Sequence, residues 1–531
     1  MFPFHLYRLL KDNRMRYTLL FLLFFCCFSQ AQEILIPISS KVKDAVLFSN
    51  SSQRIIGQGF FPVSYTEANY TFPKKDTSAG WIKRKLFNEH FIQQEGNLFL
   101  LAVDPLLNIT FGKEQSNSTD YLFQNTRGFQ VTGQLIDKIS FYTAFYENQA
   151  RFMNYQGAYF TSRGELYPSN GIYKKANAVI PGGGRTKPFK NNSFDYASSV
   201  SYVRYKPFDQ LAITFGHNPK FYGFGHRSLL LSDNSYNFTH LTIDWNITSK
   251  ISYRLMRGKQ LNLMRKVYSN QVEAPYERKG IGVHYLSYQP IPSLSIGLFE
   301  SSIYLRDDAI SSYRVNPLFY QPVIGVNSIA SGAESNNMKN LFGINVAWKM
   351  HPNHIVYAQG VSDDFSRMEY GFQIGYRTGN TVGIKNLRLQ VEYNQASSYL
   401  YAAQNKRMSY THFNLPLAHT LGNGFQELLV RASYSWKNIY IEGELMYYET
   451  VQPLDSKTRL FQSKLVGSGT NPTTVQYGKA ELGYELNPAY HLCVFARGIY
   501  RSSNRTYGND QANTAVFFGI RTALKNRNVD F

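Results

Sequence analysis

The feature that most constrains the fold of this chain is a two-residue alternation of apolar and polar side chains, which recurs in separate segments over residues 97–524. In one segment, Leu241, Ile243, Trp245 and Ile247 alternate with Thr242, Asp244 and Asn246. The same alternation occurs at residues 129–135, 342–348, 387–393, 428–436 and 516–524. Successive side chains of a β-strand point to opposite faces, so each segment is predicted to be a strand with one apolar face. We therefore expect an all-β chain.

The strands fit a membrane-spanning barrel. Beyond residue 31 no apolar run approaches the roughly 20 residues that a transmembrane helix needs. A membrane protein without such helices must close its strands into a barrel, because lipid offers no partner for free backbone groups. The 40 Tyr, 39 Phe and charged fraction of 17% suit this fold, in which aromatic girdles flank an apolar outer band. A soluble β-sandwich or propeller also alternates, and it is the competing fold.

The charged residues in the strands follow the polar face. Arg388, Glu392, Arg431 and Arg521 all lie in phase with the polar positions of their segments. A charge on the lipid face near the membrane midplane would cost about 2–4 kcal/mol. The phase therefore predicts a polar, hydrated barrel interior.

The N-terminus has the pattern of a secretory signal peptide. Lys11, Arg14 and Arg16 precede the apolar run of residues 17–28, and small residues up to Ala31 offer a cleavage site. The run is too short to span a bilayer as an anchor. We expect residues 1–31 to be removed and the mature chain to be exported to the outer membrane.

The mature chain divides into two parts. Residues 32–96 are predicted to be a small periplasmic or plugging region that is partly helical, because residues 81–92 carry apolar side chains at helical spacing. Residues 97–531 are predicted to be the barrel, a transmembrane antiparallel sheet of about 14–18 strands at roughly 25 residues per strand and link. The chain ends on Phe531, and a terminal aromatic residue after an amphipathic last strand is the mark that barrel assembly machinery reads.

Charge and cysteine content limit the partners. The formal net charge is +20, which favours anionic neighbours such as lipopolysaccharide phosphates or an acidic polysaccharide. No basic helix or known module indicates nucleic acid. Only Cys493 remains after residue 31, so no intrachain disulfide can form. We expect no cofactor.

One segment resembles a known family. Residues 216–234 read GHNPKFYGFGHRSLLLSDN and are similar to the signature of Wzi-like capsule-assembly proteins and the related RemB-like gliding-motility proteins. Residues 179–189, 391–394 and 415–422 are similar to the RemB-like branch, although Phe224 and His226 stand where that branch usually has Asp and Tyr.

The resemblance implies a non-enzymatic outer-membrane β-barrel that is associated with surface polysaccharide or with the gliding-motility apparatus. Its partners would then be lipopolysaccharide, surface polysaccharide, and capsule-export or motility proteins. A porin or transporter for small solutes is the alternative. The lumen distinguishes the two, since the Wzi-like interpretation expects it to be blocked by inward loops or by the N-terminal region.

The same segment supplies the candidate ligand site: Tyr222, His226, Arg227, Asp233 and Asn234. Tyr222 and Phe224 offer rings for stacking on a sugar, Arg227 offers a planar fork for a carboxylate or phosphate, and Asp233 and Asn234 can bind hydroxyls. The structural alternative is a folded-in loop in which Arg227 pairs with Asp233 and braces the lumen. Under both interpretations we expect the segment inside the barrel, near its outer mouth.

Three other patterns are weaker. His226, Ser228 and Asp233 are the residue types of a hydrolytic triad, but no second element indicates an oxyanion hole. Residues 181–185 read PGGGR, which lacks the order and the strand–helix context of a phosphate loop. His412 and His419 have no acidic or cysteine ligands nearby in sequence. We expect a turn at 181–185, no metal site and no enzyme.

Overall fold

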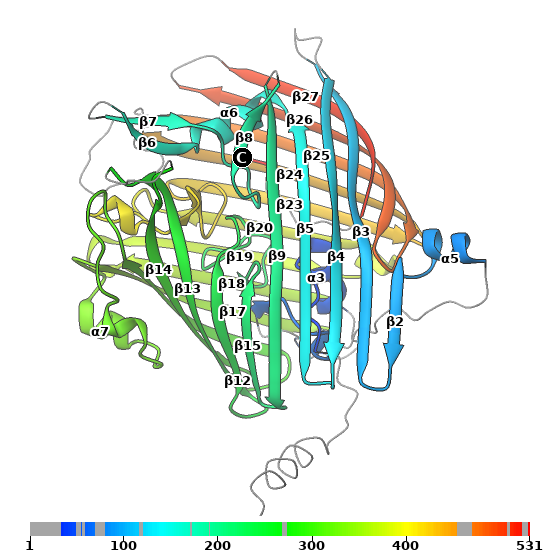
Figure 1. Cartoon of the computed structure of the whole chain (residues 1–531), viewed down its shortest axis with the longest axis horizontal. Coiled ribbons are helices and arrows are strands. Elements are labelled where there is room, and N and C mark those ends of the chain that lie inside the picture. Colours follow the sequence, from blue (N-terminus) through cyan, green and yellow to red (C-terminus); the bar gives the residue numbers. More distant parts are fainter. Residues whose placement is uncertain are drawn as a thin grey trace, which may run out of the picture.

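The computed structural model describes residues 33–48, 55, 59–68, 80–115, 121–169, 172–190, 192–267, 273–453, 470–506, 510–522 and 529–531. The predicted signal peptide, residues 1–31, lies outside these residues. The described chain forms a closed antiparallel barrel of 18 strands (Figure 1). The predicted fold class is therefore confirmed.

The barrel strands follow one another around the wall in sequence order, and the last pairs with the first. They are β3 (Phe99–Glu114), β4 (Tyr121–Leu135), β5 (Ile139–Arg151), β9 (Ser193–Phe208), β10 (Leu211–His217), β12 (Thr239–Asn246), β13 (Ile251–Arg265), β14 (Tyr276–Tyr288), β15 (Leu294–Leu305), β17 (Met338–His351), β18 (His354–Asp364), β19 (Glu369–Thr378), β20 (Arg388–Ala396), β23 (Phe425–Trp436), β24 (Ile439–Pro453), β25 (Thr470–Asn487), β26 (Leu492–Arg505) and β27 (Gln511–Arg521).

The short elements lie between and before these strands. They are α3 (Ser40–Phe48), β1 (Phe60–Phe61), α4 (Tyr65–Ala68), α5 (Trp81–Phe87), β2 (Ile92–Gly96), α6 (Asn154–Ser162), β6 (Glu165–Ser169), β7 (Ile172–Ala176), β8 (Thr186–Phe189), β11 (Phe221–Tyr222), α7 (Val326–Ser331), β16 (Glu334–Ser335), β21 (Thr411–His412) and β22 (Leu415–Pro416), with four short 3-10 turns. Among the described residues, no helix is both long enough and apolar enough to cross a bilayer.

The alternation sorts the side chains between the two faces of the wall. In β27, Val516 and Phe518 are exposed on the outside, whereas Arg521 of the same strand points inward and pairs with Glu481 of β25. In β20, Val391 is exposed and Glu392 is fully buried. The apolar face thus lies on the outside of the wall and the charged face on the inside, as predicted from the phase of the charges.

The two ends of the barrel differ. At one end, here the turn end, short turns join β4 to β5 and β9 to β10. The other end, here the loop end, carries the longer connections, including α6 and β6–β8 between β5 and β9. In outer-membrane barrels short turns face the periplasm and long loops face the outside. The described connections show the same asymmetry.

Segments that do not belong to the wall lie inside the barrel. The segment 33–48 enters from the turn end: Glu33 pairs with Lys206 of β9, Asp44 with Arg377 of β19, and Lys349 of β17 donates to the carbonyl of Leu47. Further up, β1 pairs with β11 inside the lumen. The interior is polar as predicted, but these inward side chains are buried against other chain segments and do not face open water.

The C-terminal tail also turns into the lumen. The structure describes residues 529–531 at this end, and the ring of Phe531 stacks on Tyr159 of α6 with 3.6 Å between ring centroids. Arg501 of β26 donates to the carbonyl of Phe531 at 3.0 Å. Phe531 is 7% exposed. In the folded barrel Phe531 is thus packed against α6 and β26; its role as a signal for barrel assembly stays a prediction.

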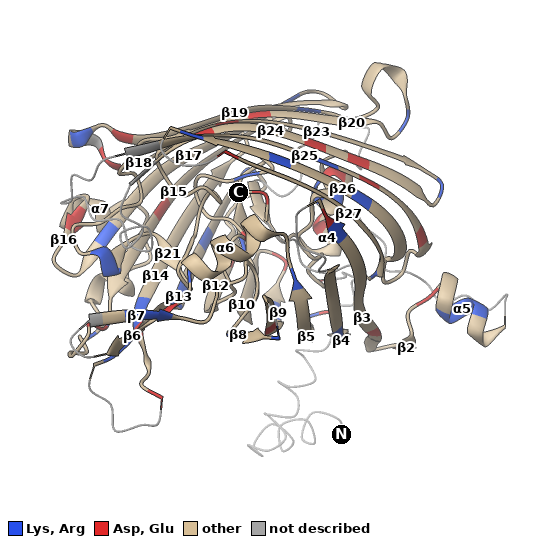
Figure 2. Cartoon of the chain, turned by 90° about the horizontal axis from the view of Figure 1, so that it is seen from above, with Lys and Arg blue, Asp and Glu red and all other residues tan. Residues whose placement is uncertain are grey.

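Two helices lie outside the ring of strands, whereas α6 and the C-terminus lie within it (Figure 2). Helix α5 stands beside β2, which pairs with the turn-end half of β3. Helix α7 covers outward-facing polar groups of the wall: Glu300 of β15 accepts from the amides of Gly325 and Ser328. Part of the connection between β15 and β17 thus packs against the side of the barrel.

Candidate functional site

The segment between β10 and β12, residues 218–238, folds into the lumen and is here called the infold. It leaves β10 at the loop end and is held by side chains of the opposite wall. Glu392 of β20 accepts from the amides of His226 at 2.7 Å and Arg227 at 3.0 Å. Gln373 of β19 donates to the carbonyl of Arg227 at 3.1 Å. These polar wall residues bind the infold backbone, so the infold spans the barrel.

The local sequence explains how the infold turns. Gly223 has a φ of +134°, a conformation that an L-residue rarely adopts. A Cβ at this position would meet the side-chain amide of Gln359 of β18. That amide donates to the carbonyl of Tyr222 at 3.0 Å and its oxygen accepts from the amide of Leu229 at 2.9 Å. Glycine is required because the chain reverses here against a wall residue.

Tyr222 and Phe224 are packed in apolar clusters. The ring of Tyr222 is fully buried, 4.9 Å from Phe60 and 5.3 Å from both Tyr285 and Phe299, each measured between ring centroids. Phe224 is also fully buried, in a cluster with Leu47 of α3. Other side chains cover both rings, which leaves no open face for a stacked sugar.

Arg227 lies at mid-height in the barrel, level with the middle of β20, and not near the outer mouth as expected. It is 3% exposed. Its Nη2 donates to Oδ2 of Asp530 at 2.5 Å, and its Nε lies 3.8 Å from Oε1 of Glu427 in β23. Burial opposes its charge, but Asp530 and Glu427 raise the pKa of Arg227 above its usual value.

The predicted pairing of Arg227 with Asp233 is therefore wrong. The partner of Arg227 comes from the C-terminal tail, more than 300 residues away in sequence. Asp233 is 8% exposed and its Oδ2 has no hydrogen-bond partner among the described residues. Only the presence of a buried Arg could be predicted from sequence; nothing in the tail indicated that Asp530 would meet it.

Asn234 holds the infold to the loop between β20 and β23. Its side chain donates to the carbonyl of Pro416 at 3.0 Å, and the amide of Ser232 donates to the carbonyl of Leu417 at 2.8 Å. The hydroxyl of Tyr401 donates to the carbonyl of Leu229 at 2.6 Å. The two segments are thus bound to each other inside the barrel.

His226, Ser228 and Asp233 do not form a triad. Ser228 donates to the carbonyl of Tyr222, and Nδ1 of His226 lies 3.4 Å from the hydroxyl of Ser40 in α3. Within the described residues, no hydrogen bond joins the three side chains of the predicted constellation. The contacts of Ser228 and His226 instead hold the infold in its conformation and against α3.

His226 does approach two carboxylates. His226, Glu444 and Asp530 place potential ligand atoms within 4.8 Å of one another. Burial lowers the pKa of His226 well below its usual value, and neighbouring cations lower it further: Arg431, Arg227, Lys43 and Lys479. Glu444 is itself paired with Lys479 at 3.0 Å. The positive surroundings disfavour a bound cation, and we describe the cluster as an ion-pair network.

The two histidines considered for a metal site serve separate contacts. Nδ1 of His412 accepts from the amide of Leu261 at 3.1 Å. Nε2 of His419 lies 2.8 Å from Oε2 of Glu427. Each side chain fixes a loop to the wall.

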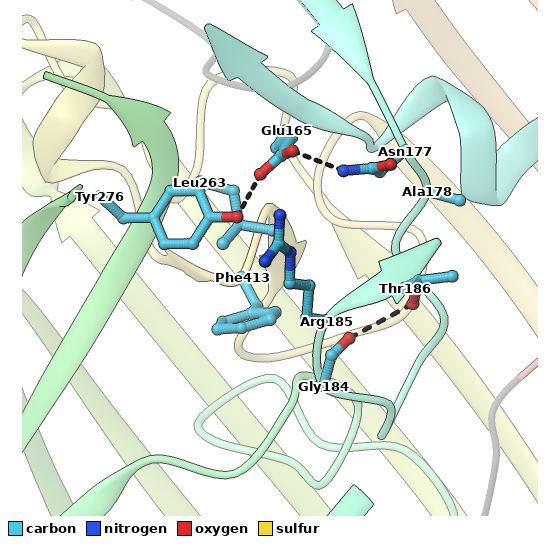
Figure 3. Close-up of a pocket in the computed structure, with 9 residues that line it drawn as sticks. All are labelled: Glu165, Asn177, Ala178, Gly184, Arg185, Thr186, Leu263, Tyr276 and Phe413. Carbon is cyan, nitrogen blue, oxygen red and sulfur yellow. Dashed lines mark hydrogen bonds between the residues drawn. The ribbon is translucent and has the colours of Figure 1, made fainter. Parts of the chain in front are cut away.

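The PGGGR segment lines a shallow pocket at the loop end (Figure 3). Gly183 donates to the carbonyl of Ile180 in a turn, as predicted. Arg185 makes two hydrogen bonds to Glu273, at 2.9 and 2.7 Å, and both side chains are largely exposed. Tyr276 and Glu165 also line the pocket, and the Tyr276 hydroxyl donates to the Glu165 carboxylate. A turn could be predicted from the glycines of this segment, but the pocket could not, because its other walls come from β6, β13, β14 and the β20–β23 loop.

Comparisons with known proteins address the fold. No protein-family model and no curated protein matches the chain. The chain is similar in structure to Wzi of Escherichia coli, an outer-membrane protein involved in group 1 capsule assembly and described as a carbohydrate-binding β-barrel. The TM-score is 0.53 at 12% identity, over 93% of this chain and 100% of Wzi.

Two further solved structures match with a TM-score of 0.39. OccK3 (OpdO) of Pseudomonas aeruginosa has 8% identity over 80% of this chain and 96% of its own. OccAB4 of Acinetobacter baumannii has 11% identity over 81% of this chain and 99% of its own. At such scores these two carry no argument, and at 12% identity Wzi shows the fold alone. The expected Wzi-like fold is confirmed, whereas the RemB-like part of the resemblance finds no support. The chain therefore has the fold of an outer-membrane β-barrel.

Proposed function

We propose that this chain is a non-enzymatic outer-membrane barrel that is closed to solutes and attaches or organises surface polysaccharide at its loop end. The observation that carries the proposal is the filled lumen. Inward side chains at mid-height, such as Glu392, Gln373 and Gln359, are buried against the infold, whereas a diffusion channel needs such side chains to face water. The Wzi-like fold supports the same proposal.

The sugar contact fits the loop-end pocket better than the infold. Among the described residues, Arg185 forms its ion pair with the exposed Glu273, and exposed ion pairs of this kind add little stability. A carboxylate of an acidic sugar could therefore replace Glu273 on the guanidinium fork. Tyr276 and Asn177 beside it offer a ring and an amide (Figure 3). The positive charge of the chain suits an acidic polysaccharide.

In this proposal the infold residues Tyr222, His226, Arg227, Asp233 and Asn234 support the closed lumen and position the loops of the mouth. Four of them are buried and His226 is partly buried, so they lie beneath the surface that a polymer outside the cell would touch. Lipopolysaccharide and capsule-export proteins are the proposed partners around the barrel.

Two measurements test the proposal together. In planar bilayers the purified protein should give no steady conductance, because the infold blocks the lumen. In a binding assay with the acidic surface polysaccharide of the producing cell, Arg185→Ala should weaken binding, whereas Lys250→Ala, which removes an exposed charge at the turn end, should not. Large stable current steps would favour the porin alternative. Equal binding by the two variants would reject the pocket as the sugar site.

A further inference from the structure

Helix α5 is fixed to the outside of the barrel at the turn end. The side chain of Asn487, at the β25–β26 turn, donates to the carbonyls of Lys85 and Glu89, each at 3.0 Å. The hydroxyl of Tyr490 donates to the carbonyl of Lys85 at 2.9 Å. Lys85 also pairs with Glu89 at 2.8 Å. These buried contacts set the orientation of the helix.

The chain that leaves the helix is held as firmly. Asp104 of β3 lies 2.7 Å from Nδ1 of His90 and accepts from the amide of Phe91 at 3.0 Å. The next residues enter β2, which pairs with β3. Helix α5 is thus tied to the turn-end rim and stands outside the ring of strands (Figures 1 and 2).

The other side of this helix is apolar and uncovered. Trp81 is 60% exposed and Ile82 66%, and Leu86, Phe87 and Phe91 are each more than 40% exposed. In the sequence analysis these side chains were assigned to a periplasmic or plugging region. Because α5 stands outside the ring of strands (Figure 2), its side chains do not fill the lumen.

The tryptophans show what this face meets. The chain has 4 Trp, and all are about half exposed or more. Three lie at the turn ends of strands: Trp245 pairs with Leu211, Trp348 with Leu294 and Trp436 with Ile439, each the first residue of its strand. Such outward tryptophans form the aromatic girdle at the membrane–water interface. Trp81 is the fourth, on a helix beside the same end of the barrel.

We propose that α5 is an interfacial helix that lies in the inner leaflet of the outer membrane, with Trp81, Ile82 and Phe87 among the acyl chains and Lys83 at the phospholipid headgroups. An amphipathic helix of this kind buries its apolar face at the boundary between headgroups and acyl chains. Its apolar side chains continue the lipid-facing band of the barrel through Phe91, Ile92 and Phe99. The exposed Lys83 suits anionic phospholipid.

Fluorescence of single tryptophans tests this directly. The variant Trp245→Phe/Trp348→Phe/Trp436→Phe keeps only Trp81. A matched variant, Trp81→Phe/Trp245→Phe/Trp348→Phe, keeps only Trp436 of the girdle. Both full-length proteins are reconstituted in vesicles of phosphatidylethanolamine and phosphatidylglycerol, with lipids brominated near the glycerol end of the acyl chains. Quenching of Trp81 should lie within about twofold of that of Trp436, because both are placed at the interface.

A further variant separates lipid contact from mere proximity. Ile82→Asp/Phe87→Asp in the Trp81-only protein changes exposed side chains alone, and it should lose most of the lipid quenching while acrylamide quenching rises. The proposal is overturned if Trp81 is quenched by acrylamide and not by brominated lipid, or if this variant is quenched by lipid as before. A third result would also overturn the proposal: Trp81 is quenched by acrylamide in vesicles but is shielded from it in native outer membranes. That result would indicate that a protein partner covers the helix.

Discussion

Replacing Arg227 with alanine tests the network that joins the infold to the C-terminal tail. Arg227 is 3% exposed and its guanidinium holds Asp530 at 2.5 Å. Glu427, its second acidic neighbour at 3.8 Å, keeps other partners in the variant: Asn394 donates to it at 2.9 Å and His419 lies at 2.8 Å. Asp530 has no such reserve, because its other oxygen is buried without a hydrogen-bond partner among the described residues.

The expected free-energy change follows from this difference between Glu427 and Asp530. Removing one member of a buried ion pair costs about 3–5 kcal/mol, since the remaining charge stays desolvated. The tail can avoid that cost by leaving the lumen, at the loss of the Phe531–Tyr159 stack and the Arg501 hydrogen bond. We therefore expect a local effect, in which the equilibrium for tail release shifts by about 3 kcal/mol, or roughly a hundredfold.

Hydrogen exchange read by mass spectrometry measures that shift. Peptides that contain residues 226–231 and 529–531 should exchange about a hundredfold faster in Arg227→Ala, while the peptides of β3 and β4 keep their protection. Arg185→Ala, which breaks an exposed ion pair, is the matched control and should change little. The double variant Arg227→Ala/Asp530→Ala removes both charges and should recover most of the protection. The reasoning is refuted if the double variant is no better than the single one, or if Arg227→Ala behaves like the control.

Three further predictions follow from the same region. Gly223→Ala should lower the thermal midpoint by the equivalent of about 1–3 kcal/mol, because its backbone conformation is unfavourable for alanine and its Cβ meets Gln359, whereas Gly443→Ala, with open space at its Cβ, should cost less. Burial lowers the pKa of Lys43 to about 7 from 10.5, so between these values the folded chain binds fewer protons than the unfolded chain and its stability rises with pH; the thermal midpoint should rise across this window more in the wild type than in Lys43→Met. Asn234→Ala should lose about 1 kcal/mol of stability through its hydrogen bond to the chain, while polysaccharide retention on cells stays normal; a binding defect in a well-folded variant would return the sugar site to the infold.

The sequence alone determined the architecture of this protein. Strand phase is a local property, since neighbouring side chains of a strand must face opposite sides, and so the outward Val391 and the inward Glu392 could be assigned from their positions. The length of the chain and the spacing of its turns bounded the strand number, which the structure sets at 18. The turn at 181–185 could also be predicted from the sequence, because glycine content is a local signal.

Only the tertiary structure decided how the interior is used. The partner of Arg227 is Asp530 at the far end of the chain, and not Asp233, the nearest acid in sequence. The reason is that the contacts of a segment inside the barrel depend on which wall and tail residues lie at the same height. Whether an apolar helix plugs the lumen or faces the membrane also depends on where it is tied: α5 has the spacing of a core helix, and the hydrogen bonds of Asn487 and Tyr490 place it outside. The periodicity of apolar residues indicates which side of a helix or strand is apolar. The contacts of the folded barrel decide what that side faces.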